Sequence, residues 1–355
     1  SPHIIPHLVS HTAFFQLKDL GMALPPYREF VEEHVLSPDL CKNYESLKLA
    51  ARDLIAKGRK TRDGHLLSST IQALLAYPDR AWMGECLTNN KGETLFTLAP
   101  LPAHCLLPKE QALLTYVAEQ RKLGRRVLVF CTHTQSKDIT ARLNTILCKA
   151  GLRSAILPAS IPPERRMQWI DDRTAEGLDA LICNPKLIAT GLDLIAYPSI
   201  KWYEVEYSTY LVRQASRRSW RPFIQKQAVE VSFSLYKQTF QEQAWALVAA
   251  GIKSALQTEG DLTSEGLSDY QQADDLMTQL IRQVLDRNAT VLSAETMFAE
   301  LAALYTIDPQ QSDKPALADT VYPPSPEDIL IPATLISTPR RGKATSTLQL
   351  SLFGT

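Results

Sequence analysis

The chain has 355 residues, of which 45% are hydrophobic and 21% are charged, the composition of an ordinary soluble globular protein. Its formal net charge is zero, yet residues 121–226 carry 18 Lys/Arg against 9 Asp/Glu, a net charge of +9, whereas residues 1–120 carry 12 against 13 and residues 227–355 carry 8 against 16. A basic middle between neutral and acidic flanks indicates a polyanionic partner for the middle alone.

The six cysteines contain no Cys-x-x-Cys pair and no zinc-ligand spacing, so we expect reduced thiols in a cytoplasmic protein and no metal site. His3, His7 and His11 fall at helical spacing, but the neighbouring prolines disfavour a regular helix, and we interpret these residues as unrelated loop histidines. No apolar run has membrane-spanning length, and we expect no signal peptide. The chain begins Ser-Pro without an initiator Met, so we expect a fragment or a processed piece.

Residues 1–105 are expected to form a mostly helical connector. Leu24-Pro25-Pro26 marks an extended segment within it. Ser37-Pro38 predicts a helix start with Pro in the first turn, and two apolar stripes at helical spacing follow before residue 77. Residues 80–105 show no clear pattern.

From residue 106 the pattern alternates between helices and short apolar strands. Helices are predicted at 109–122, 135–149, 162–176 and 208–220 and from 239, and strands at 126–131, 153–157, 179–183, 199–205 and 229–234. This alternation predicts an α/β fold, a parallel sheet flanked by helices, over residues 106–255. We expect an acidic helical extension at 256–306 and a disordered tail at 307–355, which is rich in Pro, Ser, Thr and Gln.

Three polar segments are predicted to meet at one edge of this sheet. Residues 131–134 and 184–193 each follow a strand, as does the helix that contains residues 214–221. Because ligands of open parallel sheets bind at the carboxyl ends of the strands, we expect these segments to share that rim.

Residues 214–221 read Gln-Ala-Ser-Arg-Arg-Ser-Trp-Arg. Arg218 and Arg221 are three residues apart, so on a helix they would project from one face. A guanidinium is permanently charged and offers a planar fork of donors that suits phosphate oxygens, and two on one face repel each other unless an anion lies between them. The alternative interpretation is a solvated basic helix end.

Together these segments resemble the second, C-terminal RecA-like lobe of superfamily-two helicases. Residues 127–134, 184–194 and 214–221 stand in the order and spacing of motifs IV, V and VI of that lobe. Gly191-Leu192-Asp193 is similar to motif V of the DEAD-type members, and the Gln-Ala-x-x-Arg-x-x-Arg pattern is closer to the Swi/Snf-type translocases. The likeness extends from about residue 10 to 265 and is strongest to the bacterial and mobile-element branch that acts on DNA.

The resemblance implies a nucleotide-facing role for five residues. Arg221 would be the arginine finger that reaches the γ-phosphate of ATP across the lobe interface, with Arg218 beside it on the phosphates. Gln214 would help to set the helix against the nucleotide. Asp193 would contact the ribose, and Gly191 would shape the turn that couples nucleotide to nucleic acid.

Four other residues would face the nucleic acid. Thr132, Thr134 and Lys186 would hold the DNA backbone without reading bases, and Thr190 would share the coupling turn. Thr132, Thr134, Lys186 and Asp193 have alternative interpretations if the family is set aside. The two threonines of residues 132–134 would cap the following helix, Asp193 would be an ordinary turn residue, and Lys186 would be a solvated loop lysine.

The chain departs from the family pattern in two places. The family usually continues after the second Arg with Ile-Gly-Gln, whereas Pro222-Phe223-Ile224-Gln225 follows here and alters the turn. The chain also lacks a Gly-x-x-x-x-Gly-Lys-Ser/Thr loop and an Asp-Glu-x-His/Asp box. This polypeptide alone is therefore not expected to hydrolyse ATP, and ATP and Mg²⁺ would be held mainly by a first RecA-like lobe upstream or on another chain.

The tail contains a short motif of its own. Gln349, Leu350, Leu352 and Phe353 belong to a Gln-Leu-Ser-Leu-Phe segment that resembles the pentapeptide by which many bacterial DNA-replication and repair proteins bind the sliding clamp. Such a segment presents apolar side chains to a pocket while Gln makes backbone contacts. Chance occurrence of so short a motif is the alternative.

Two functions of different classes follow. In the first, the chain supplies the arginine finger and part of the nucleic-acid track of an ATP-dependent DNA helicase or translocase. In the second, it is a non-catalytic DNA-binding or scaffold module tethered to the sliding clamp by its tail. A Gly-Lys-Thr/Ser loop and an Asp-Glu box encoded in frame upstream of Ser1 would favour the motor.

Overall fold

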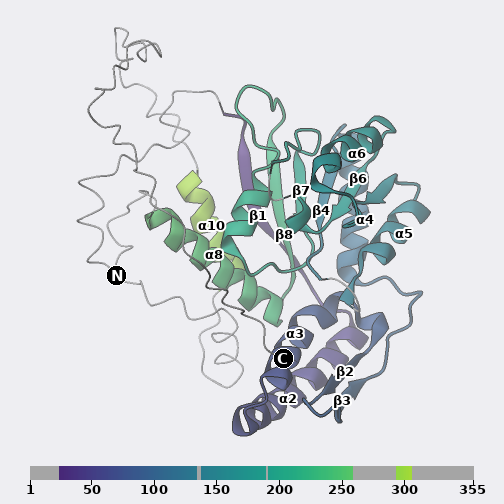
Figure 1. Ribbon diagram of the computed structural model, residues 1–355, viewed down its shortest axis with the longest axis vertical. Coiled ribbons are helices and arrows are strands. Elements are labelled where there is room, and N and C mark those ends of the chain that lie inside the picture. Colours follow the sequence, from purple (N-terminus) through teal and green to yellow (C-terminus); the bar gives the residue numbers. More distant parts are fainter. Residues whose placement is uncertain (1–23, 134–136, 189–190, 259–292, 306–355) are drawn as a thin grey trace, which may run out of the picture. The chain divides into compact units, whose positions relative to one another are not determined.

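The computed structural model describes residues 24–133, 137–188, 191–258 and 293–305. Six strands form one parallel sheet in the order β1-β8-β7-β4-β6-β5 (Figure 1). Their bounds are β1 Tyr27–His34, β4 Val127–Phe130, β5 Ser154–Ile156, β6 Ala180–Cys183, β7 Ser199–Trp202 and β8 Val229–Tyr236. The helices are α2 Pro38–Thr61, α3 Gly64–Ala76, α4 Pro108–Lys122, α5 Thr140–Lys149, α6 Pro163–Ala175, α7 Thr209–Ser216, α8 Phe240–Thr258 and α10 Ala294–Tyr305.

Helices cover both faces of the sheet because successive strand residues point to opposite sides. Val127 and Val129 of β4 belong to a core cluster with apolar residues of α4 and α5. Leu128 and Phe130 belong to the opposite cluster, which contains apolar residues of α6, α7 and α8. The predicted α/β fold, a parallel sheet flanked by helices, is confirmed.

An aromatic cluster forms the centre of the second core. The rings of Phe130 and Trp202 lie 4.5 Å apart, and those of Phe233 and Trp245 lie 4.8 Å apart. Phe233 also stacks on Phe298 of α10 at 4.2 Å, so α10 packs on the same core as α8 and the sheet. Truncating one of these buried aromatic side chains to Ala is expected to cost about 3–5 kcal/mol of stability.

Two predicted helices have different bounds in the structure. α5 begins at Thr140 rather than at residue 135, because the Asp138 carboxylate accepts the Thr140 N–H at 2.8 Å and starts the first turn there. α7 ends at Ser216 rather than at residue 220. Beyond its end, the Arg218 carbonyl accepts the Leu194 N–H at 3.1 Å, which draws the chain away from the helix axis.

The extended segment after Pro25-Pro26 is a strand that the sequence pattern did not reveal. β1 pairs in parallel with β8 over its whole length, from Tyr27 opposite Val229 to His34 opposite Tyr236. The partner strand begins nearly two hundred residues later, so only the tertiary structure brings the two together.

A helical and hairpin module, residues 38–98, packs at the carboxyl ends of the strands. Phe240 and Gln241 follow the end of β8, and the Phe240 N–H donates to the Tyr44 hydroxyl at 2.9 Å. The Gln241 amide donates to the Leu75 carbonyl at 2.8 Å and to the Asp79 carboxylate at 2.7 Å. The carboxyl edge near β8 is therefore covered by α2, α3 and the short 3₁₀ helix Tyr77–Asp79 (Figure 1).

The module ends in an antiparallel hairpin of β2 (Glu85–Thr88) and β3 (Thr94–Leu98), in a stretch where we expected no pattern. Asn89 closes the turn, because its side-chain oxygen accepts the N–H groups of Lys91 and Glu93 at 3.0 Å each. The Asn-Asn-Lys-Gly turn sequence is a signal that would have found the hairpin.

Within the described residues, the helices lack the combination of length and hydropathy that a bilayer crossing requires. All six cysteines are free thiols.

Candidate functional site

A basic pocket of about 360 Å³ lies beside α7 and the turn that follows it. α7 starts where the Ser208 hydroxyl accepts the Leu211 N–H at 3.2 Å, and its apolar side chains are buried against the sheet. Its opposite side faces the pocket. The lining residues are Tyr210, Arg213, Gln214, Arg217, Arg218 and Arg221.

The structure brings Gln214, Arg218 and Arg221 together in this pocket, although not on one helix face. The helix ends before Arg217, and turns carry the chain onward, with the Trp220 N–H donating to the Arg217 carbonyl at 3.2 Å. The Gln214 amide donates to the Tyr210 hydroxyl. The Arg221 guanidinium reaches back to the Arg217 carbonyl at 3.0 Å, which holds it over the helix end.

Asp193 is part of the same site. Its Oδ1 accepts a hydrogen bond from Arg221 Nε at 2.6 Å, with the side chains 57% and 28% exposed, respectively. Gly191 precedes it with a φ of +73°, a left-handed conformation that favours glycine. The motif-V-like and motif-VI-like segments therefore meet at an ion pair.

Four arginines line the pocket, and its described lining residues include no carboxylate. Glu29 of β1 lies behind it and interacts electrostatically with Arg217 and Arg213, and burial raises the pKa of that carboxyl. The Asp193 carboxylate offsets part of the charge of these arginines through its ion pair with Arg221. Arg218 Nε makes no hydrogen bond with a described residue, and burial followed by the charge of Arg221 lowers the pKa of its guanidinium. An anion bound beside Arg218 would accept a hydrogen bond from its Nε and would offset the repulsion between the Arg218 and Arg221 guanidiniums.

The expectation that this site shares one rim with residues 131–134 and with the start of segment 184–193 is wrong. The Ser219 hydroxyl donates to the Tyr197 carbonyl at 2.7 Å, two residues before β7 begins. The Trp220 indole donates to the Pro25 carbonyl at 2.8 Å, two residues before β1 begins. The arginines therefore lie at the amino edge of the sheet. The reason is that α7 leaves the carboxyl end of β7 and runs back to the start of β8.

Thr132 and Asn184 do lie together at the carboxyl edge, after β4 and β6. The Asn184 amide donates to the Thr132 carbonyl at 3.0 Å, and its oxygen accepts the Lys186 N–H at 3.0 Å. The Thr132 hydroxyl donates to the Val205 carbonyl at 3.1 Å. Thr132 therefore does not cap the following helix, which begins at Thr140. Lys186 is exposed and makes no ion pair with a described residue.

Glu204, which sequence reasoning missed, holds this edge together. The backbone N–H groups of Thr132 and His133 donate to its Oε2 at 2.7 and 2.9 Å. The residue is only 1% exposed, and Oε1 has no hydrogen-bond partner among the described residues. Burial raises the pKa of Glu204 to about 7, against the effect of those two hydrogen bonds. In the sequence, only the position of Glu204 near the end of a predicted strand could have indicated its role.

Several predicted site residues lie outside the described part of the chain. They are Thr134, Thr190 and the tail residues Gln349, Leu350, Leu352 and Phe353. The N-terminal histidines also lie outside it. In the remainder, no group of three or more His, Cys, Asp or Glu side chains is placed to hold a metal ion.

Comparison with known proteins gives a fold likeness and no sequence likeness. No protein-family profile and no curated protein sequence match this chain. The solved structure of the C-terminal part of the Fun30 ATPase domain is similar, with a TM-score of 0.53 and 15% identity, over 74% of this chain and 98% of that one.

A DEAD box protein from the hyperthermophile Methanococcus jannaschii aligns over 41% of this chain and 37% of its own length, with 14% identity and a TM-score of 0.33, too low to support an argument. The likeness to the Fun30 fragment shows that this chain has a RecA-like α/β fold.

Proposed function

We propose that this chain is the second motor lobe of an ATP-driven nucleic-acid helicase or translocase of superfamily two. One observation carries the proposal. Arg218, Arg221 and Gln214, which the sequence motifs select, line one arginine-rich pocket, and Asp193 joins them through its ion pair with Arg221. The fold likeness to the C-terminal part of an ATPase domain supports the same conclusion.

On the nucleotide side, the chain contributes cations and no phosphate-cradling loop. Arg221 acts as the arginine finger and Arg218 as a second phosphate contact, while Gln214 and Asp193 border the nucleotide. When ATP and Mg²⁺ are bound, mainly by a first RecA-like lobe, they supply the phosphoanhydride and the metal charge for hydrolysis. The residues of this chain then stabilise negative charge on the phosphates.

On the nucleic-acid side, Thr132 and Lys186 hold the backbone from the carboxyl edge, with Thr134 and Thr190 nearby in sequence. The side chain of Lys186 is exposed, as a phosphate contact requires. Asn184 and Glu204 hold the two loops in register by bonding to the main chain of residues 132–133. DNA rather than RNA, and a bacterial or mobile-element setting, follow from the resemblance in sequence.

The two proposed sites lie at opposite edges of one sheet, so a movement of the lobe would act on both. The arginines lie at the amino edge and the Thr132 loop at the carboxyl edge of the same sheet. Asn184, which bonds to the Thr132 carbonyl, and Asp193, which pairs with Arg221, are nine residues apart in the sequence, with η6 (Pro185–Leu187) between them. A lobe that moves as one body on ATP binding would therefore displace the backbone contacts as well.

The test is nucleic-acid-stimulated ATP hydrolysis by the protein in which this lobe and a Walker-type lobe are both present. Arg221→Ala is expected to lower the turnover number by about 10³-fold or more, because an arginine finger is worth that much in related chemistry. Arg52→Ala, which removes an exposed arginine of α2, is the matched control and should keep wild-type turnover. Full turnover in Arg221→Ala would remove the finger assignment.

A non-catalytic scaffold is the second candidate. The observation that favours it is the Arg221–Asp193 pair, which occupies the finger with a carboxylate of its own lobe. In that case the lobe binds DNA and is tethered to the sliding clamp through residues 349–353. A chain whose nucleic-acid binding is unaffected by ATP, and which has no partner lobe, would support this function over the motor.

A further inference from the structure

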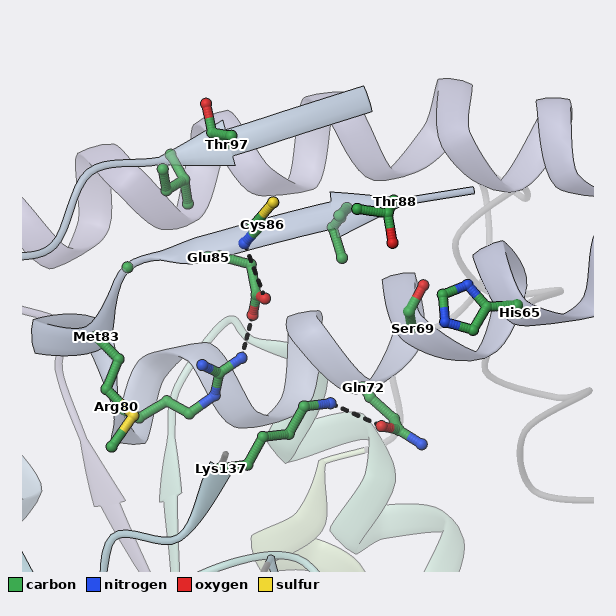
Figure 2. A pocket seen from close by; sticks show the side chains of 13 residues that line it. His65, Ser69, Gln72, Arg80, Met83, Glu85, Cys86, Thr88, Thr97 and Lys137 are labelled. Atoms are coloured by element: carbon green, nitrogen blue, oxygen red, sulfur yellow. Dashed lines mark hydrogen bonds and ion pairs between the residues drawn. The ribbon is translucent and has the colours of Figure 1, made fainter. Parts of the chain in front are cut away.

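A second cavity, of about 650 Å³, lies between α3, the β2–β3 hairpin and the loop that follows β4 (Figure 2). It is separate from the arginine pocket and shares no lining residue with it. Polar side chains from all three sides face it, including His65, Ser69, Gln72, Arg80, Thr88 and Lys137. None of these residues belongs to the sequence motifs.

Lys137 enters the cavity from the loop after β4. Its ammonium donates to the Gln72 side-chain oxygen at 2.7 Å and forms no ion pair with a described carboxylate (Figure 2). The side chain is half-buried. Burial, and then the charge of Arg80, lower the pKa of Lys137, so the charged ammonium is held there at a cost.

Arg80 is the second cation and is only 5% exposed. One of its terminal nitrogens bonds to Glu85 on β2, and its Nε has no hydrogen-bond partner in the described residues. Glu85 is the one carboxylate among the lining residues, and its charge is matched by Arg80. Lys137 is therefore the cation of this cavity that has no ion-pair partner among the described residues, although the charge of Glu85 favours its ammonium form.

The cavity continues the carboxyl edge on which the backbone contacts are proposed. Lys137 lies five residues after Thr132 in the same loop. Burial lowers the pKa of the intervening His133 to about 4, and the charges of Lys137 and Arg80 contribute to that shift. The electrostatic influence of both cations therefore extends to the residue whose N–H is held by Glu204.

We propose that this cavity binds a phosphate of the nucleic-acid backbone, with Lys137 as the charged contact and the Thr88 hydroxyl as a donor. The inference rests on the proposed function and extends it, because it adds the polar side chains that line this cavity to the nucleic-acid track. A neutral ligand would leave the Lys137 ammonium without an ion pair. A phosphodiester supplies one negative charge and several acceptor oxygens.

Fluorescence-anisotropy titrations of the full 355-residue chain test this, with a labelled single-stranded 20-mer and its duplex between about 50 and 200 mM KCl. Lys137→Gln is expected to weaken binding about fivefold or more at the lowest salt and to reduce the salt slope by about one. Lys137→Arg should restore both. Lys57→Gln on the exposed side of α2 is the matched control and should match wild type. Circular dichroism confirms that each variant is folded.

Each result has a distinct meaning. Wild-type affinity and slope in Lys137→Gln, with weaker binding in Lys186→Gln, would overturn the cavity and leave the proposed function standing. No binding of either nucleic acid by wild type would overturn both. A thermal stabilisation by millimolar inorganic phosphate that Lys137→Gln abolishes, without any effect on nucleic-acid binding, would assign the cavity to a small phosphate ligand and overturn the backbone contact.

Discussion

Arg221 Nε lies 2.6 Å from Asp193 Oδ1, and this single ion pair joins the turn after α7 to the segment that follows β6. Because both side chains are partly exposed, the pair adds little to folding stability. Its main effect is on the pocket, where the carboxylate lowers the net positive charge available to a phosphate.

Asp193→Asn should therefore bind inorganic tripolyphosphate about two- to fivefold more tightly than wild type, as expected for removing one partly screened charge. ATP should gain less, because the ribose contact that the resemblance implies for Asp193 is lost as well. Calorimetric titrations with both ligands measure the difference. Asp53→Asn on α2 is the control, and equal tripolyphosphate affinity in the two variants would contradict the prediction.

Phe223 adopts a φ of +63° although it is neither Gly nor Asn, and 71% of it is exposed. It occupies the turn after Arg221, where the helicases that the sequence resembles usually have a glycine. A left-handed conformation costs a residue with a Cβ about 1–2 kcal/mol. Phe223→Gly should thus be more stable than Phe223→Ala by about 1 kcal/mol, once the greater unfolded-state freedom of Gly is included. Urea denaturation of both variants checks this, and equal midpoints would argue against strain in the turn.

Glu204 should make stability depend on pH in the range just below neutrality. Its pKa is raised to about 7 from an ordinary value of 4.5, so between these limits the folded state binds more protons than the unfolded state. The contribution of Glu204 to stability is therefore complete below pH 4.5 and is lost as the pH rises through 7. Asp79, with a pKa raised to about 6 by burial, contributes with the same sign.

Two histidines act in the opposite direction, because burial lowers the pKa of His34 and of His133 to about 4. A Glu204 variant is needed to separate the contribution of this residue to the pH dependence of stability from those of the histidines and Asp79. The stability of Glu204→Gln relative to wild type should rise between pH 5 and pH 8. The reason is that wild type loses stability as the buried Glu204 becomes charged, whereas the Gln side chain has no charge to acquire. Urea unfolding at both pH values measures this. Parallel stability curves for the two proteins would show that Glu204 does not titrate as expected.

The tail motif makes an independent prediction. Leu352→Ala combined with Phe353→Ala should abolish binding to a sliding clamp, because these side chains would fill its apolar pocket. Leu348→Ala, just before the motif, is the matched control and should bind as wild type does. Surface plasmon resonance with immobilised clamp measures both. Clamp binding that survives the double substitution would show that the resemblance is accidental.

Local patterns predicted much of the fold. The alternation of apolar strands with helical stripes predicted the parallel sheet, and Ser37-Pro38 predicted the start of α2 with Pro in its first turn. These features depend on neighbouring residues, so the chain itself contains the information. The hairpin of β2 and β3 also depends on neighbouring residues, and its Asn-rich turn was overlooked rather than hidden.

Long-range pairing was not predictable in the same way. β1 finds its partner in β8, and Glu204 finds the main chain of Thr132 and His133 more than seventy residues away. A carboxylate after a strand has no periodicity that distinguishes a structural acceptor from a solvated side chain. Only the packed structure shows that Glu204 is buried and what it bonds.

The sequence by itself predicted which side chains belong to one site, because Arg218, Arg221, Gln214 and Asp193 stand in segments that resemble known motifs. The tertiary structure decided where they meet. A helix that leaves the carboxyl end of one parallel strand must return to the amino end of the next, so the turn after α7 carries the arginines to the edge opposite Thr132. Motif spacing along the chain is the same for either edge, and the direction of the connecting helix alone distinguishes them.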